Sequence, residues 1–307
     1  MPAVVRRSKL LKLRLDRFSH AMAGIERGDV RSLHRVRVAS RRLRELVPIL
    51  QLEADTAKKL SRRLRKVTAR LGSLRELDVL VALIDDLRRS SPEHREALNR
   101  VGVAVAKARD ESRKRRLDEL PAEELDRVAR KLARVLNDVR RSEEAGSARG
   151  GPARAKAALW AIDARIAHRA GRLQQFVQSA GALYLPDRLH AVRIAVKKLR
   201  YAIELAPASH QPRRADDLRG LRRVQEILGR MHDFQVLIDR VRGVQASLAP
   251  PSLAAWRQLD ALLTAMDDEC RRLHARYVRA RADLDELTRR LVAAPSAPST
   301  RSARHAG

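Results

Sequence analysis

Aromatic residues and cysteines are scarce in this chain of 307 residues. Aromatics make up 3% of the sequence, although hydrophobic residues reach 44%, so the core must be built from Leu, Val, Ile and Ala. That set suits packed helices better than sheets. Cys270 is the single cysteine, which excludes an intramolecular disulfide and favours a reducing, cytoplasmic location.

Long hydrophobic runs are also missing. No stretch approaches the roughly 18 uncharged apolar residues that a membrane span needs, so we expect none. The start of the chain carries Arg6-Arg7, which superficially resembles a twin-arginine signal. Lys9, Lys12 and Arg14 interrupt the segment that follows, and we therefore expect no signal peptide.

Acidic residues are too few to balance the basic ones. The chain has 66 Lys and Arg against 37 Asp and Glu, a formal net charge of +29. Such an excess destabilises a compact protein by self-repulsion unless a partner offsets it. The charge therefore predicts a polyanionic partner: inorganic polyphosphate, nucleic acid or an anionic membrane surface.

Hydrophobic residues recur at helical spacing along almost the whole chain, and no segment alternates as a strand does. Two apolar stripes show this spacing: Val36, Ala39, Leu43, Leu46, Val47 and Leu50, and then Leu60, Leu64, Val67, Leu71 and Leu74. Short breaks such as Pro121 and Pro186-Asp187 separate the helices, so the pattern predicts an all-α protein of antiparallel bundles.

A stretch rich in small residues divides the chain into two halves. It contains Gly146, Gly150, Gly151 and Pro152, and we predict a flexible linker over residues 146–153. The predicted organisation is a first helical repeat over 1–145 and a second over 154–293. Residues 294–307, rich in Ala, Pro, Ser and Arg, are expected to form a disordered tail.

The two halves are related in sequence. Residues 33–44 align with residues 189–200 at an offset of 156, with seven of twelve positions identical and three conservative. Further on, Leu71-Gly72 aligns with Leu228-Gly229 at an offset of 157, and the same register pairs Glu76 with Asp233. The same order at nearly the same spacing indicates an internal duplication.

The aligned segments place basic residues along one edge of a helix. On a helical wheel His34, Arg37, Arg41 and Arg44 gather opposite the apolar stripe, as rungs spaced about 5–6 Å apart. The second copy repeats them as His190, Arg193, Lys197 and Arg200, and the next helix carries Arg62, Arg65 and Lys66, which recur as Arg219, Arg222 and Arg223.

Like charges at this spacing cost an isolated helix a few tenths of a kcal/mol per pair. Their presence in both copies implies a ligand that offsets the repulsion. A chain of phosphates fits, because guanidinium forks bind phosphate oxygens bidentately and a neutral imidazole donates to them. Two such helix edges, one from each half, are expected to line a shared groove.

The duplicated pattern His-x-x-Arg-Val/Ile-Ala-x-Arg/Lys-Arg/Lys-Leu-Arg, followed in each half by Leu-Gly-x-x-(Arg/His)-(Glu/Asp), resembles the CHAD family, the conserved-histidine α-helical domain. The resemblance covers roughly residues 8 to 292. It implies two four-helix bundles related by a pseudo-two-fold axis, with inorganic polyphosphate bound by basic residues in a central groove or pore. By matching position it implies ligand contacts at His34, Arg37, Arg41, Arg42, Arg44, His190, Arg193, Lys197, Lys198 and Arg200.

Two positions depart from the family pattern. Glu76 stands where the family usually has Asp, and Gln235 stands where the first copy has Asp78. We interpret these acidic positions as residues that orient neighbouring cations or cap a helix.

Other functions have less support from the residues. No metalloprotease, P-loop or nucleophile-elbow motif is present, so we expect neither catalysis nor a cofactor. The motif histidines have cationic neighbours that repel divalent metals. The main alternative is a general nucleic-acid-binding protein, but few aromatic residues are available for base stacking, which argues against it.

The expected function is non-enzymatic polyphosphate binding in the cytoplasm, with polyphosphate granules or the nucleoid as destinations. The oligomeric state is left open.

Overall fold

The computed structural model describes residues 6–26, 30–70, 72–117, 122–207, 213–248 and 252–293, and every regular element within those ranges is a helix. The predicted all-α class is therefore confirmed. The helices are α1 (Arg7–Glu26), α2 (Val30–Leu46), η1 (Val47–Ile49), α3 (Ala54–Arg70), α4 (Gly72–Ser90), η2 (Pro92–His94), α5 (Arg95–Leu117), α6 (Ala122–Ala180), α7 (Pro186–Ile203), α8 (Arg214–Ala246) and α9 (Leu253–Ala293). Across these ranges no helix is apolar over a length that would cross a bilayer.

The apolar stripes read from the sequence form the core. All members of the α2 stripe are buried, and so are Leu60, Leu64 and Val67 of α3, whereas Leu71 and Leu74 lie outside the residues whose side chains the structure describes. In α7 the repeated positions Val192 and Leu199 are fully buried. Because the apolar face of each helix is fixed in the core, its basic face is fixed as well.

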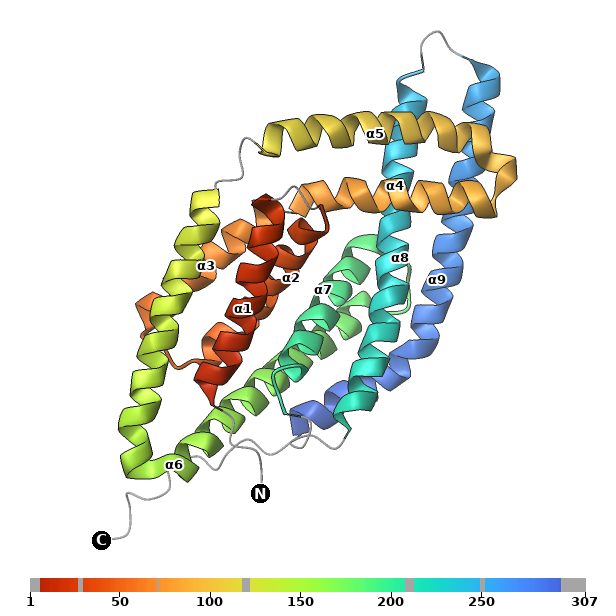
Figure 1. Ribbon diagram of the computed structural model, residues 1–307. Coiled ribbons are helices and arrows are strands. Elements are labelled where there is room, and N and C mark those ends of the chain that lie inside the picture. Colours follow the sequence, from red (N-terminus) through yellow and green to blue (C-terminus); the bar gives the residue numbers. More distant parts are fainter. Residues whose placement is uncertain are drawn as a thin grey trace.

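The second half of the chain is a four-helix bundle. The latter part of α6 packs against α7 and α9, and α7 and α9 both pack against α8 (Figure 1). Phe234 of α8 and Tyr277 of α9 are among the largest fully buried side chains. The long helices α8 (33 residues) and α9 (41 residues) give this half its shape, and Figure 1 shows α9 curving toward its C-terminal end.

The first half departs from that arrangement. In the second half, α8 continues through Leu228-Gly229. In the first half the matching segment is interrupted, because α3 ends at Arg70 and α4 begins at Gly72. Helices α4 and α5 then lie across α8 and α9 (Figure 1). A second difference is that α5 ends at Leu117 and α6 begins at Ala122, whereas α9 continues without a break from Leu253 to Ala293.

The predicted four-helix architecture is thus seen in regular form in the second half, and the pseudo-two-fold relation between the halves stays a prediction. The halves share their packing at the helices that carry the duplicated motif, since α2 contacts α7 directly.

The segment predicted to be a flexible linker, 146–153, has a helical backbone and belongs to α6. Figure 1 shows α6 turning sharply near its middle, so that its two parts run in different directions. Glycines and a proline inside a helix favour such a bend. Before the bend, Glu143 ties α6 to α1, because its carboxylate accepts hydrogen bonds from the Ser8 hydroxyl at 2.5 Å and the Arg7 backbone N–H at 2.8 Å. The predicted tail, 294–307, lies outside the described residues.

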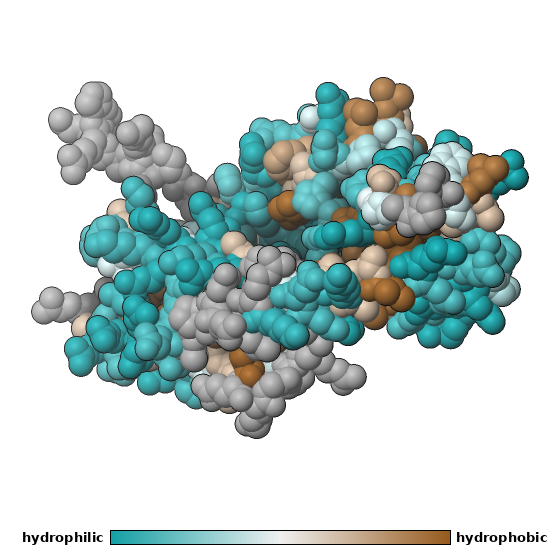
Figure 2. Space-filling model, turned by 90° about the horizontal axis from the view of Figure 1, so that it is seen from above, coloured by the Kyte–Doolittle hydropathy of each residue, from teal (hydrophilic) through white to brown (hydrophobic). Residues whose placement is uncertain are grey.

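The face of the molecule seen in Figure 2 is covered largely by hydrophilic residues, and hydrophobic ones gather in small groups toward one side. Among the exposed large apolar side chains, Val103 lies on α5, Leu183 lies in the connection between α6 and α7, and Leu253 and Trp256 lie near the start of α9.

Candidate functional site

A cavity of about 390 Å³ lies where the two halves of the chain meet. Helices α2 and α4 of the first half and α7 and α8 of the second contribute most of its lining. Its basic and histidine residues are Arg37, Arg41, Arg44, His190, Arg193, Lys197, Lys198 and His232. Most of these are positions that the sequence predicted.

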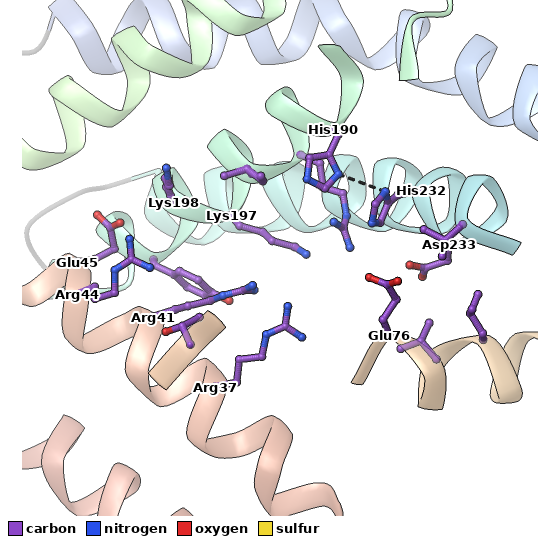
Figure 3. A pocket seen from close by; sticks show the side chains of 17 residues that line it. Arg37, Arg41, Arg44, Glu45, Glu76, His190, Lys197, Lys198, His232 and Asp233 are labelled. Atoms are coloured by element: carbon purple, nitrogen blue, oxygen red, sulfur yellow. Dashed lines mark hydrogen bonds between the residues drawn. The ribbon is translucent and has the colours of Figure 1, made fainter. Parts of the chain in front are cut away.

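The basic edges of α2 and α7 face each other across this cavity. Figure 3 shows Arg37, Arg41 and Arg44 reaching from α2 toward the α7 residues Lys197 and His190. Each row follows the helical repeat, so successive rungs on a row lie about one turn apart. The expectation that both copies line one groove agrees with this placement.

One end of the cavity is anchored by Glu45, whose side chain is almost fully buried. Its carboxylate accepts hydrogen bonds from Arg165 at 2.8 Å and from Arg169 at 2.7 Å, both in α6. Burial, followed by the charge of Arg169, lowers the pKa of the Lys198 ammonium. Cations therefore crowd this end, and a bound anion would relieve their mutual repulsion.

A histidine pair lies at the opposite end. The Nδ1 atoms of His190 and His232 are 3.2 Å apart and the ring centroids 4.5 Å apart, so one ring donates and the other accepts. Burial, and then the charge of Arg193, lowers the pKa of His190 and lowers that of His232 to about 4. Both rings are thus neutral at physiological pH.

Arg42 and Arg200 hold the two motif helices together and do not line the cavity. Glu204, just after α7, forms ion pairs with Arg42 at 2.9 Å and with Arg200 at 3.5 Å. Both guanidinium groups also lie over the Tyr201 ring, at 5.7 and 4.9 Å from its centroid. Arg42 follows Arg41 directly in the sequence and so points about 100° further around the helix.

Other predicted contacts lie away from the cavity. His34 is exposed and does not line it, unlike its counterpart His190. Lys66 lies 3.5 Å from Glu124, and Arg219 pairs with Asp216. The other basic residues predicted on α3 and α8 are exposed: Arg62, Arg65, Arg222 and Arg223.

Several lining residues were not predicted as ligand contacts. The repeat alignment pairs Glu76 with Asp233 and places His232 beside them, but the acidic pair was interpreted as orienting or capping residues. In the structure all three line the cavity. Arg165 and Arg169 carry no comparable signal, because they lie outside the repeated motif in a generally Arg-rich helix. Only the fold brings them to Glu45.

No group of three or more His, Cys, Asp or Glu side chains is arranged to hold a metal ion in the part of the chain that the structure describes. The cavity lining is instead dominated by guanidinium and ammonium groups, which suit an anion.

Fold and cavity together define an all-α protein in which two helical halves enclose a basic site. A family model, the CHAD domain, matches residues 9–242, and the chain belongs to the CHAD family. The crystal structure of the CHAD domain from the plant Ricinus communis is similar in fold, with 21% sequence identity and a TM-score of 0.59, over 96% of this chain and 95% of that one. No curated protein matches the sequence.

The histidine pair predicts a pH-dependent stability. The pKa of His232 is lower in the folded protein than its unfolded value of 6.5, so protonation favours the unfolded state. The stability that depends on a neutral His232 is therefore fully present above about pH 6.5 and is lost as the pH falls toward 4. Asp187 and Glu76 oppose the shift at His190, whereas Arg193 and Lys197 reinforce it. Replacing His232 by Gln should therefore reduce the acid-induced loss of unfolding free energy by about 1–3 kcal/mol.

Urea unfolding at neutral pH and near pH 4.5 measures this difference, with the same replacement at the exposed His20 as the control. An equal acid-induced loss in the native protein and in H232Q would contradict the assignment.

Proposed function

We propose that the cavity between α2 and α7 binds inorganic polyphosphate without chemically changing it. The observation that carries this proposal is the meeting of two cationic helix edges, one from each half, in one cavity. Arg37 and Arg41 come from α2, and Arg193 and Lys197 come from α7. Binding of this kind would recruit the protein to polyphosphate-rich bodies in the cytoplasm.

The chemistry of the lining supports a chain of phosphates. A guanidinium group binds two phosphate oxygens at once and keeps its charge at any physiological pH. Rows of cations repeating at each helical turn meet a ligand whose negative charges also repeat along its length. A cleft of one sign of charge focuses the field on such a ligand and strengthens its attraction.

The shape and lining of the cavity favour polyphosphate over nucleic acid. A volume of about 390 Å³ suits a small ligand or a thin chain segment. The aromatic residue of the lining, Tyr201, is 6% exposed and lies beneath two guanidinium groups, so it offers no free face for stacking a base. Phosphate contacts remain available, whereas contacts to bases do not.

A competition titration tests the choice of ligand. Labelled polyphosphate bound to the protein is challenged with unlabelled polyphosphate or with duplex DNA, at matched phosphate concentration and salt. We expect polyphosphate to compete at least about tenfold more strongly, a difference of roughly 1.4 kcal/mol. Equal competition would make the protein a general polyanion binder.

Removal of four cavity cations tests the location of the site. Replacing Arg37, Arg41, Arg193 and Lys197 by Gln should weaken binding strongly and flatten its salt dependence, by roughly 0.7–0.9 log–log units per lost contact on the nucleic-acid scale. The matched control replaces four exposed arginines outside the cavity, Arg130, Arg240, Arg257 and Arg271. Equal losses in both variants would place binding on the general surface.

The proposal also predicts that the ligand is released unchanged. Incubation with polyphosphate and Mg²⁺ or Mn²⁺ should yield neither free phosphate nor shortened chains, measured by phosphate assay and gel electrophoresis. Turnover that follows the folded protein through purification, and disappears in the four-fold Gln variant, would show an enzyme instead.

A further inference from the structure

The second half of the chain carries another basic cavity, on the outside of its bundle. This outer cavity has a volume of about 250 Å³ and lies between α8 and α9, which pack side by side (Figure 1). Its lining consists of Arg223 from α8 and of Arg276, Arg279, Asp283 and the buried Ala280 from α9. Three guanidinium groups thus share a small space with one carboxylate.

The outer cavity is separate from the basic cavity between the halves. Helix α9, which the structure describes in full, contributes no residue to the basic cavity. Nine residues separate Arg223 from His232 along α8, which is about two and a half helical turns, so these two side chains point to opposite sides of the helix. A ligand in the basic cavity therefore lies on the other side of α8 from the outer cavity.

The arginines of the outer cavity have no acidic partner. In the part of the chain that the structure describes, none of the three forms an ion pair or a hydrogen bond, and Asp283 forms no ion pair either. Other arginines on the same two helices commonly pair with an acid one helical turn away, as Arg219 does with Asp216, Arg271 with Asp268 and Arg289 with Glu286. The charge of the outer cavity is thus left to solvent or to a ligand.

The sequence repeat provides an internal comparison. Residues 64–67 align with residues 221–224, which makes Lys66 of α3 the counterpart of Arg223. Lys66 lies 3.5 Å from Glu124 of α6, and the same carboxylate pairs with Arg70. The first half therefore neutralises this position through a neighbouring helix, whereas the second half places two further arginines beside it. Like charges gathered at one copy only indicate a ligand at that copy.

We propose that the outer cavity is a second phosphate-binding site, which holds part of a second polyphosphate chain while the first chain occupies the basic cavity. This inference rests on the proposed function and adds that one protein joins two chains. Guanidinium groups bind phosphate oxygens in pairs of hydrogen bonds and keep their charge. Asp283 opposes the anion, but three positive charges against one leave a net attraction. Because all three arginines are exposed, this site is the weaker of the two.

A sandwich assay tests this bridging. Long polyphosphate is attached to a surface, saturated with the protein and washed. Fluorescently labelled polyphosphate is then added at physiological ionic strength, where distant exposed charges are largely screened. Replacing Arg223, Arg276 and Arg279 by Gln should leave loading of the protein on the attached chain unchanged and should weaken capture of the labelled chain by about tenfold.

Two further variants act as controls. Replacing the exposed Arg130, Arg240 and Arg257 by Gln removes the same charge from positions that line neither cavity, and should lower capture by less than about twofold. Replacing Asp283 by Asn removes the opposing carboxylate and should raise capture, which damage to the fold would not do. Unchanged capture in D283N would contradict a phosphate beside this carboxylate.

The outcomes separate the two proposals. Equal capture by the outer-cavity variant and its charge-matched control would overturn the second site and leave binding in the basic cavity standing. Capture of labelled duplex DNA as strongly as of labelled polyphosphate, at matched phosphate concentration, would overturn polyphosphate as the ligand of the outer cavity. Failure of the protein to load onto the attached chain would overturn the proposed function, and this inference with it.

Discussion

The enforced closeness of like charges is the constraint on which the rest of this structure depends. The apolar faces of α2 and α7 are committed to the core through residues such as Leu43 and Leu199, both essentially fully buried. Since a helix face is fixed once its opposite face is packed, Arg41 and Lys197 must share one cavity. Core packing therefore supplies the free energy that holds these cations together.

Two carboxylates hold four of the basic residues in contacts that support the fold. Glu204 binds Arg42 and Arg200 and ties the end of α7 to α2, while Glu45 binds Arg165 and Arg169 and ties α2 to α6. Buried charges require such partners, because an uncompensated ion in the interior is costly. Arginines that are adjacent in the motif can therefore have different roles, and the motif alone does not distinguish those roles.

The sequence allowed the fold class and most of the cavity to be predicted. Helical periodicity identified the buried stripe of α2, and the repeat identified the matching edge on α7, because both follow from local spacing. Partners distant in the chain could not be predicted in this way. The contact of Arg165 with Glu45 joins residues 120 positions apart, and the exposure of His34 against the half-buried His190 reflects different packing around equivalent residues. The glycine-rich segment of α6 has the composition of a linker, but its backbone is helical and bends, because composition alone does not distinguish a bend in a helix from a break.

The two halves of the chain pack differently, and the two ends of the cavity between them differ as well. Helices α4 and α5 cross α8 and α9, so the first half does not reproduce the four-helix bundle of the second. The histidine contact correspondingly joins two residues of the second half, His190 and His232, at one end of the cavity. The two ends of the cavity therefore differ in charge.

The most direct measurement of the central claim is a crystal structure of the protein with linear polyphosphate. The account predicts phosphate density within hydrogen-bond distance of Arg37 and Arg41 on one side and of Arg193 and Lys197 on the other. Phosphates bound only to outward-facing arginines, with the cavity between α2 and α7 filled by solvent, would contradict it.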